Sequence, residues 1–479
     1  MKTAPSLRSL SAPDVPLLAK LDSALLALLC VAMCGQVDVR RFGRDTLAEG
    51  LGYASKTFAL AASDVVFVLV VGFFLLRTSQ LRGWKRLWWP PLPCYALIFA
   101  LLLSLFHSPK LLDTVAGHHH YWDKETKSAL ADIAQWAGYF LVAPWVLVNT
   151  LFDRRDETRP PINRVTLALG ALVFAFVLSG LVALVQLQSL DAFKRTAEFI
   201  KIPASQRYAE LAPHGLWSSP NLFAAFVAFL LPFLDEIEIP NPRFARVPLG
   251  LSLFAFGIAW LCVASPWALG AAFVGLLASW LARPNVHRVR VMRLTMILFV
   301  GLVFGLSWQA NPMLRTARAE ALRFTSAQGN LKKQWIEWQI ASRWNDPRER
   351  AFSTGYGAGN YQLQIGTLYQ FDTVLNDPLD KMPHDSNNLF LVQAVSVGVL
   401  GLGALLWTWS HFAGLAWRAA KSGAWLGAAT FGALVSWACV NAFHAFIVRG
   451  GGLLLGLFFA LAVVAGQTLS EREVSKSAT

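Results

Sequence analysis

The chain has 479 residues, of which 55% are hydrophobic and only 15% are charged. Soluble domains carry about a quarter charged residues, so this composition excludes a soluble multidomain enzyme, a secreted disulfide scaffold and a disordered chain. It predicts an integral membrane protein instead. The net charge of +13 is interpreted as anchoring and lipid-facing basic residues, so no nucleic-acid partner is expected.

Apolar stretches long enough to cross a bilayer recur along the whole chain. Each is expected to be a helix, because a lipid-exposed strand or loop would leave backbone amides unpaired in hydrocarbon. The predicted fold class is therefore all-α, a polytopic membrane protein of about 12 transmembrane helices. The predicted spans lie near residues 21–36, 57–76, 90–107, 129–152, 165–187, 221–239, 247–264, 266–282, 294–310, 388–409, 424–446 and 451–468.

The spans divide the chain into three parts. Residues 1–310 hold predicted helices 1 to 9 with short loops, residues 311–387 form one long loop, and residues 388–479 hold helices 10 to 12 and a tail. The long loop is not of low complexity, and two amphipathic helices are expected in it, at 313–327 and 330–344. Loops of this length in compact proteins are usually functional or disordered, and amphipathic helices can lie in the headgroup layer.

The orientation follows from basic residues in the short connectors. By alternation, the connectors that hold Arg77, Arg155 and Arg283 share one side, which the positive-inside rule makes cytoplasmic. The opposite side holds as many basic residues, but they are spread over longer segments, which escape the rule. Both termini are therefore predicted to be cytoplasmic.

Several carboxylates fall in or near apolar spans, where they are costly and often functional. Asp22 lies in the first span, and Asp64 in the second is a candidate proton relay if the protein is a transporter. Asp235 and Glu236, near the cytoplasmic end of the sixth span, are expected at the interface rather than buried.

The segment before the tenth span is rich in polar side chains. His384, Asp385, Ser386, Asn387 and Asn388 directly precede the apolar helix. Asp, Ser and Asn there are interpreted as capping residues, because their oxygens accept hydrogen bonds from free amides of the first helical turn. A cap does not account for His384, whose ring is a candidate general base.

An ordered set of motifs extends from the fifth predicted span to the tenth. Its members are Arg207, then Gly215-Leu216-Trp217-Ser218-Ser219-Pro220-Asn221, Gly355-Tyr356-Gly357-Ala358-Gly359-Asn360, His384 and Gly398-Val399-Leu400-Gly401. In this order, and with this number of spans, the chain resembles the superfamily of bacterial O-antigen ligases and O-antigen polymerases, most of all the ligases. The resemblance covers residues 207–403.

The resemblance implies a periplasmic active site in the bacterial inner membrane. An O-antigen ligase transfers a glycan from undecaprenyl pyrophosphate to the lipid A core oligosaccharide, so donor, acceptor and membrane lipids are the expected partners. His384 is the candidate catalytic residue. Fixed cations can neutralise the leaving pyrophosphate, so an inverting reaction without metal or cofactor is expected. The candidates for binding pyrophosphate or glycan are Arg207, Arg318, Lys332, Lys333, Arg343 and Asn387.

Two positions depart from the family pattern. Counted back from Gly398, the family's His-Asn pair falls on residues 387 and 388, three residues after His384. Lys332 and Lys333 stand where the family has an arginine, and an ammonium group lacks the guanidinium fork. The alternative for each loop cation is a charge that faces solvent or lipid headgroups.

Other functions stay open on the sequence alone. An O-antigen polymerase or a protein O-oligosaccharyltransferase of the same superfamily uses the same kind of donor, so residue chemistry does not separate them from a ligase. The alternative of another class is a lipid-linked glycan flippase or a secondary transporter. That alternative predicts inverted repeats, and the two halves of the sequence differ in loop length instead.

Overall fold

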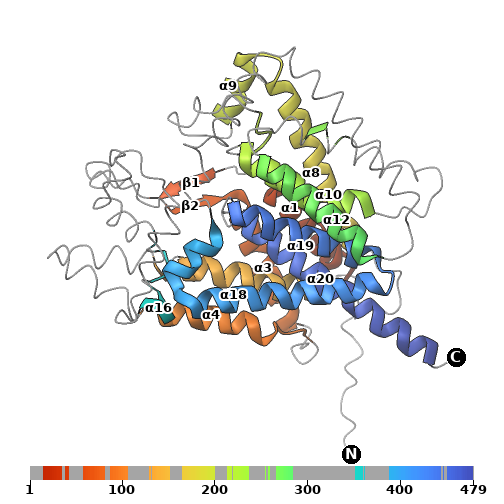
Figure 1. The fold of residues 1–479 in the computed structure, drawn as a ribbon. Coiled ribbons are helices and arrows are strands. Elements are labelled where there is room, and N and C mark those ends of the chain that lie inside the picture. The colour runs from red at the N-terminus through yellow and green to blue at the C-terminus, as the bar shows by residue number, and fades with distance from the viewer. Residues whose placement is uncertain are drawn as a thin grey trace, which may run out of the picture.

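The computed structural model describes part of the chain (Figure 1). The described residues are 15–34, 38–42, 58–80, 87–105, 129–130, 132–151, 164–199, 213–217, 220–236, 254, 257–258, 266–283, 351–355, 357–359, 361, 388–443, 446 and 450–477. Statements about structure below concern these residues.

Most of the described residues are helical, as the sequence predicts. The helices are α1 (Val15–Met33), α3 (Ala62–Gln80), α4 (Leu92–Ser104), a π-helix (Gly138–Val142) that continues into α7 (Ala143–Leu151), α8 (Arg164–Gln186), α9 (Leu190–Phe199), α10 (Pro220–Glu236), α12 (Pro266–Ala282), α16 (Ala351–Thr354), α18 (Leu389–Lys421), α19 (Trp425–Phe443) and α20 (Gly450–Ser477). They cover the predicted spans except 247–264 and 294–310, which lie mostly or wholly outside the described residues.

Four of these helices are long and apolar enough to cross a membrane. They lie at Ala62–Ser79, Arg164–Gln186, Leu389–Lys421 and Trp425–Phe443, and shorter apolar helices lie at Leu92–Ser104, Trp267–Ala282 and Gly451–Gln467. These helices indicate a helical membrane protein. The total of twelve spans and the periplasmic placement of the long loop stay predictions.

One β-hairpin adds to the helical fold. Strand β1 (Asp38–Phe42) pairs antiparallel with β2 (Phe58–Ala61), with Phe42 opposite Phe58 and Asp38 opposite Ala61. The predicted span 57–76 is therefore wrong at its start, because its first residues pair in the hairpin and its helix begins at Ala62. A strand can form there because the neighbouring strand satisfies its backbone groups.

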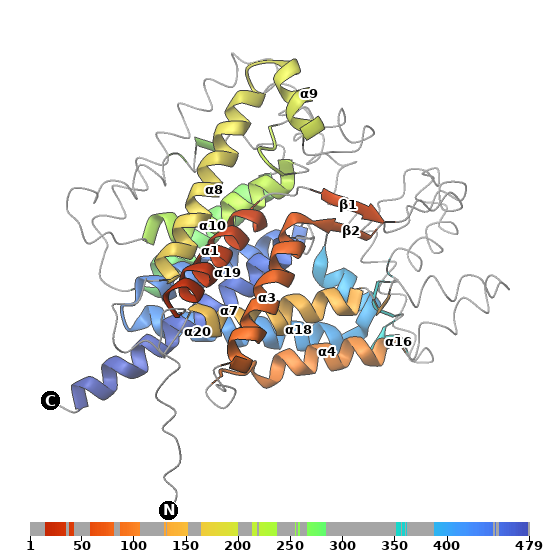
Figure 2. The ribbon, with the colours of Figure 1, turned by 180° about the vertical axis from the view of Figure 1, so that it is seen from behind.

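Helix α19 packs at the centre of the bundle. It contacts α10, α12, α18 and α20 (Figures 1 and 2). Small residues allow the closest approach, since a Cβ at Gly432 would lie 2.6 Å from the Gly275 carbonyl oxygen of α12. Ser436 Oγ donates a hydrogen bond of 3.0 Å to the Ala271 carbonyl across the same interface.

The bundle has two chemically different ends. At the charged end, which we define by Asp22, Arg77, Arg164, Glu236 and Arg283, helices α3, α10 and α12 end and α8 begins. At the glycine end, which we define by residues 213–217, 355, 357–359 and 398, α8 ends and α10 begins.

The two ends agree with the predicted alternation of the chain. Arg77, Arg164 and Arg283, from connectors predicted to be cytoplasmic, all form ion pairs at the charged end. Helix α18, which follows the long loop, begins at the glycine end and ends beside Leu281 of α12. Which membrane the protein occupies, and which side the termini face, stay predictions.

Candidate functional site

The residues predicted to act on substrate all lie outside the part of the chain that the structure describes. This applies to Arg207, Arg318, Lys332, Lys333, Arg343, His384 and Asn387. Their roles stay predictions. The structure does describe the segments that flank Arg207 and His384 at the glycine end.

Asn388 begins helix α18 as a cap. Its backbone is extended, with φ −121°, and its side-chain Oδ1 accepts a hydrogen bond of 3.0 Å from the Leu391 amide. The capping interpretation is confirmed for this residue. The cap lies four residues after His384 in the sequence and fixes the start of α18 at Leu389.

Helix α18 is broken at Gly398. This residue has φ 71° and ψ −171°, a conformation that is essentially restricted to glycine. A Cβ at Gly398 would lie 2.5 Å from the Ser353 carbonyl carbon, so α16 packs directly against the break. Residues 389–397 therefore form a separate half-helix at the glycine end.

The glycine-rich loop after α16 pairs with the broken helix. Gly355, Gly357 and Gly359 all have positive φ, as expected for tight turns. The Gly357 amide donates a hydrogen bond of 2.9 Å to the Ser396 carbonyl, two residues before the break. Ser104 Oγ, at the end of α4, accepts a hydrogen bond of 3.0 Å from the Ala358 amide. Two distant parts of the motif set thus contact each other.

The half-helix carries two buried polar side chains that the sequence reasoning did not identify. Gln393 is 2% exposed and Ser396 is 3% exposed. Gln393 Nε2 and Ser396 Oγ have no hydrogen-bond partner among the described residues. Burying an unpaired polar group costs about 1–3 kcal/mol, so such groups are usually completed by a further segment, water or ligand.

Gln186, at the end of α8, holds the segment that follows Arg207. Its Oε1 accepts hydrogen bonds from the amides of His214, at 2.9 Å, and Gly215, at 3.0 Å. Its Nε2 donates to the Gly215 carbonyl at 3.2 Å. Ser179 Oγ accepts a further bond of 3.1 Å from the Leu216 amide. These contacts fix residues 214–216 to α8, although the bonded residues lie 28 to 37 positions apart in the sequence.

His214 is the described histidine of this segment, and it is buried in neutral form. Burial lowers its pKa to about 4, although hydrogen bonding with the backbone at Trp217 and Gly215 opposes that shift. Its Nε2 lies 3.4 Å from Gln186 Nε2. Phe193 of α9 packs edge-on against the ring at 5.2 Å.

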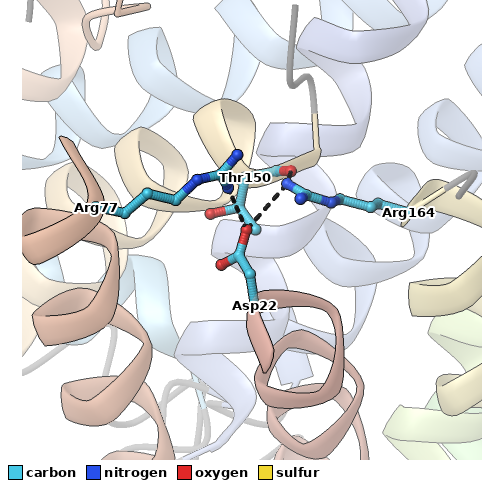
Figure 3. Close-up of polar contacts among 4 residues, drawn as sticks. All are labelled: Asp22, Arg77, Thr150 and Arg164. Atoms are coloured by element: carbon cyan, nitrogen blue, oxygen red, sulfur yellow. Dashed lines mark hydrogen bonds and ion pairs between the residues drawn. The ribbon is translucent and has the colours of Figure 1, made fainter. Parts of the chain in front are cut away.

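The charged end is built from ion pairs instead. Asp22 of α1 pairs with Arg77 of α3 at 2.6 Å and with Arg164 of α8 at 3.0 Å (Figure 3). Arg164 also donates a hydrogen bond of 2.7 Å to the Thr150 carbonyl of α7. The carboxylate in the first predicted span therefore joins helices and does not stand alone in hydrocarbon.

The carboxylates at the end of α10 are paired in the same way. Asp235 accepts a hydrogen bond of 2.7 Å from Trp280 Nε1, and Glu236 pairs with Arg283 at 3.0 Å. They lie at a helix end as predicted, but the expectation that they are not buried is wrong, since both are less than 10% exposed. Trp280 of α12 and Arg283, which directly follows α12, compensate their burial.

No group of three or more His, Cys, Asp or Glu side chains able to hold a metal ion occurs among the described residues. The metal independence of the reaction stays a prediction. Comparison with known protein families and with characterised proteins gives no match for this chain. The resemblance to the O-antigen ligases and polymerases therefore depends on the residues of the motif set.

Proposed function

We propose that the protein transfers a glycan from a lipid pyrophosphate donor to a membrane-bound acceptor, as an O-antigen ligase does. The observation that carries the proposal is the packing of the motif set. Gly355 and Gly357 contact the half-helix at the break of Gly398, and residues 214–216 are fixed to α8, all at the end of the bundle where α18 begins.

Chain connectivity supports a common site for Arg207 and His384. Arg207 precedes Pro213 by six residues, and His384 precedes Asn388 by four residues. Extended chains of these lengths span at most about 22 Å and about 14 Å. The hydrocarbon core is about 30 Å thick, so neither segment can cross it. The proposal therefore puts both side chains on the aqueous side that the glycine end faces.

The reaction follows from these residue types. His384 removes the proton of an acceptor hydroxyl, whose oxygen attacks the anomeric carbon of the donor. The bond from that carbon to the pyrophosphate oxygen breaks, and undecaprenyl pyrophosphate leaves with the electron pair, so the anomeric centre inverts. Arg207 and the loop cations Arg318, Lys332, Lys333 and Arg343 stabilise the leaving charge.

The half-helix 389–397 is a platform for the glycan in this scheme. Asn388, Gln393 and Ser396 are buried at the glycine end. Amide and hydroxyl side chains match the donor and acceptor groups of a sugar. A hydroxyl-rich substrate would complete the hydrogen bonding of Gln393 and Ser396. Asn387, the neighbour of the cap, is the further candidate for this contact.

Reconstituted transfer tests the proposal. The purified protein in vesicles, given undecaprenyl pyrophosphate-linked glycan and lipid A core, is expected to form glycan-bearing lipid A core, also in the presence of EDTA. His384→Ala is expected to abolish the product because it removes the base. Arg207→Lys is expected to slow transfer, since a lysine does not bind phosphate oxygens with two parallel hydrogen bonds. Full transfer by His384→Ala would contradict the proposed mechanism.

The outcome of the same assay distinguishes the alternative functions. Lengthened lipid-linked glycan indicates a polymerase, and glycan on a protein acceptor indicates a protein O-oligosaccharyltransferase. Movement of the donor across the bilayer without bond formation indicates a flippase and would overturn the proposed transfer. Gly270→Leu is the control for the effect of a substitution as such. It lies on the exposed face of α12, where a Cβ meets no atom within 4 Å, and it is expected to keep transfer activity.

A further inference from the structure

The stretch of chain that carries Arg207, residues 200–212, connects α9 to the segment that begins at Pro213. Helix α9 folds back beside the end of α8 (Figures 1 and 2). Phe193 of α9 packs edge-on against the ring of His214, with 5.2 Å between the ring centroids. The described residues on the two sides of this stretch therefore contact each other, so the stretch is closed at its base.

Gln186 ties this base to α8. The side chain is 0% exposed, and its Oε1 accepts hydrogen bonds from the amides of His214, at 2.9 Å, and Gly215, at 3.0 Å. Its Nε2 donates a bond of 3.2 Å to the Gly215 carbonyl. All three bonds go to backbone groups, so an apolar side chain at position 186 would leave those groups without these partners.

Gly215 allows the close contact between this segment and α8. Its φ of 58° lies in the left-handed region, which favours glycine. A Cβ at Gly215 would collide with Ser179 Oγ, and the same Oγ accepts a hydrogen bond of 3.1 Å from the Leu216 amide. The segment therefore has one fixed position against α8 where it leads into α10.

We propose that Gln186 is a positioning residue for Arg207. It fixes residues 214–216 to α8 and so fixes the base of the stretch that carries the arginine. The inference rests on the proposed function, in which Arg207 binds the pyrophosphate of the donor. A guanidinium group that binds phosphate by two parallel hydrogen bonds requires an exact placement. Misplacement of a group at a reaction site by about 1 Å can slow a reaction about 100-fold.

The charged end contains a clamp of the same kind, which supplies a matched control. Asn149 of α7 accepts a hydrogen bond of 2.8 Å from the Trp88 amide and donates one of 3.0 Å to the Trp88 carbonyl. The next residue, Thr150, binds Arg164 of the charged end through its carbonyl. Gln186→Leu and Asn149→Leu both remove hydrogen bonds to backbone groups, but only Gln186 lies at the base of the stretch that carries Arg207.

The first measurement is glycan transfer in vesicles, below the temperature at which the variants unfold. Gln186→Leu is expected to lower kcat/KM for the donor by about 10-fold to about 100-fold. Asn149→Leu is expected to keep the parent value. Gln186→Glu is expected to retain most of the activity, since a protonated carboxyl group accepts at one oxygen and donates from the other. In an Arg207→Lys background, Gln186→Leu is expected to cost less than about three-fold, because the positioned interaction is already lost.

The second measurement does not depend on transfer. Arg207→Cys is labelled with a nitroxide in a chain from which the five native cysteines have been removed. Gln186→Leu is expected to shorten the rotational correlation time of the label, because the base of the stretch is released. Gln186→Glu and Asn149→Leu are expected to keep the parent value. An inactive parent protein with these label results would contradict the proposed function and leave the clamp standing.

Two results would overturn the inference in an active parent protein. The same loss of kcat/KM by Gln186→Leu with Arg207 and with Arg207→Lys would show that Gln186 does not act through the arginine. An unchanged label at position 207 in Gln186→Leu would show that the clamp does not hold this stretch. If Gln186→Leu fails to fold, Ser179→Ala, which removes only the bond from the Leu216 amide, is expected to change both readings in the same direction by less, and no change in either would overturn the inference.

Discussion

The charged end and the glycine end hold their helices together by different chemistry. At the charged end, Asp22 joins α1 to α3 and α8 through two arginines. At the glycine end the contacts are neutral hydrogen bonds and close backbone approaches, such as the pairing of Gly357 with Ser396. The ion pairs compensate the buried carboxylate at the charged end, whereas at the glycine end Gln393 Nε2 has no hydrogen-bond partner among the described residues. This difference fits the proposed function, in which the charged end assembles the bundle and transfer takes place at the glycine end.

The largest expected effect comes from the centre of the charged end. Asp22→Ala would leave Arg77 and Arg164, both mostly buried, without their shared carboxylate. Removing one partner of a buried pair costs about 3–5 kcal/mol. The free energy of unfolding in detergent is expected to fall by this amount, while glycan transfer below the unfolding temperature persists.

The double variant Asp22→Ala with Arg164→Leu is the control for that result. It removes one uncompensated charge, so it is expected to recover part of the lost stability. Loss of transfer in a folded Asp22→Ala protein would break the division of roles between the two ends.

The break in α18 gives the next largest effect. Gly398→Ala forces a Cβ into a conformation reserved for glycine and against the Ser353 carbonyl. Strain and overpacking together are expected to cost about 2–4 kcal/mol. Gly403→Ala is the matched control on the same helix, because its Cβ meets no atom within 4 Å. That variant is expected to keep or gain stability, and equal destabilisation of both would contradict the broken helix.

His214 makes the stability of the glycine end depend on pH. Its pKa is about 4 in the folded protein and about 6.5 when unfolded, so the unfolded chain binds the proton more readily. Stability is therefore present above about pH 6.5 and is lost as pH falls toward 4, by about 2 kcal/mol at pH 5. Thermal unfolding of the parent protein and of His214→Gln at pH 7.5 and pH 5 measures this loss. The same pH dependence in both proteins would exclude His214 as its source.

Ser104 gives the smallest expected effect. Its Oγ accepts the hydrogen bond from the Ala358 amide at 3.0 Å and donates one of 2.6 Å to the Leu101 carbonyl. Ser104→Ala is expected to cost about 1 kcal/mol, the typical net value of one buried hydrogen bond. The unfolding midpoint of the variant measures this loss. Its transfer activity, measured in parallel, shows whether a looser glycine-rich loop also slows the reaction. Unchanged stability would mean that this bond does not hold the loop.

The sequence predicted the helical class because apolar runs of membrane length allow no other regular structure. It also predicted the cap at Asn388, which depends on neighbouring residues only. It did not predict the hairpin, the break at Gly398 or the role of Gln186. Each depends on a partner far away in the chain, and a helix-like apolar pattern runs unchanged through Gly398. The two glycines after it, at 401 and 403, are helical, so the presence of a glycine in this apolar run did not indicate where the helix breaks.

The sidedness of Arg207 and His384 tests the central claim most directly. Single cysteines at positions 207, 384 and 421 are introduced after the five native cysteines have been removed. A membrane-impermeant maleimide is then applied to intact and to permeabilised spheroplasts. Arg207→Cys and His384→Cys are expected to react in intact spheroplasts, and Lys421→Cys, at the charged end, only after permeabilisation. Reaction of positions 207 and 384 from opposite sides, or of 384 and 421 from the same side, would contradict a transfer site at the glycine end.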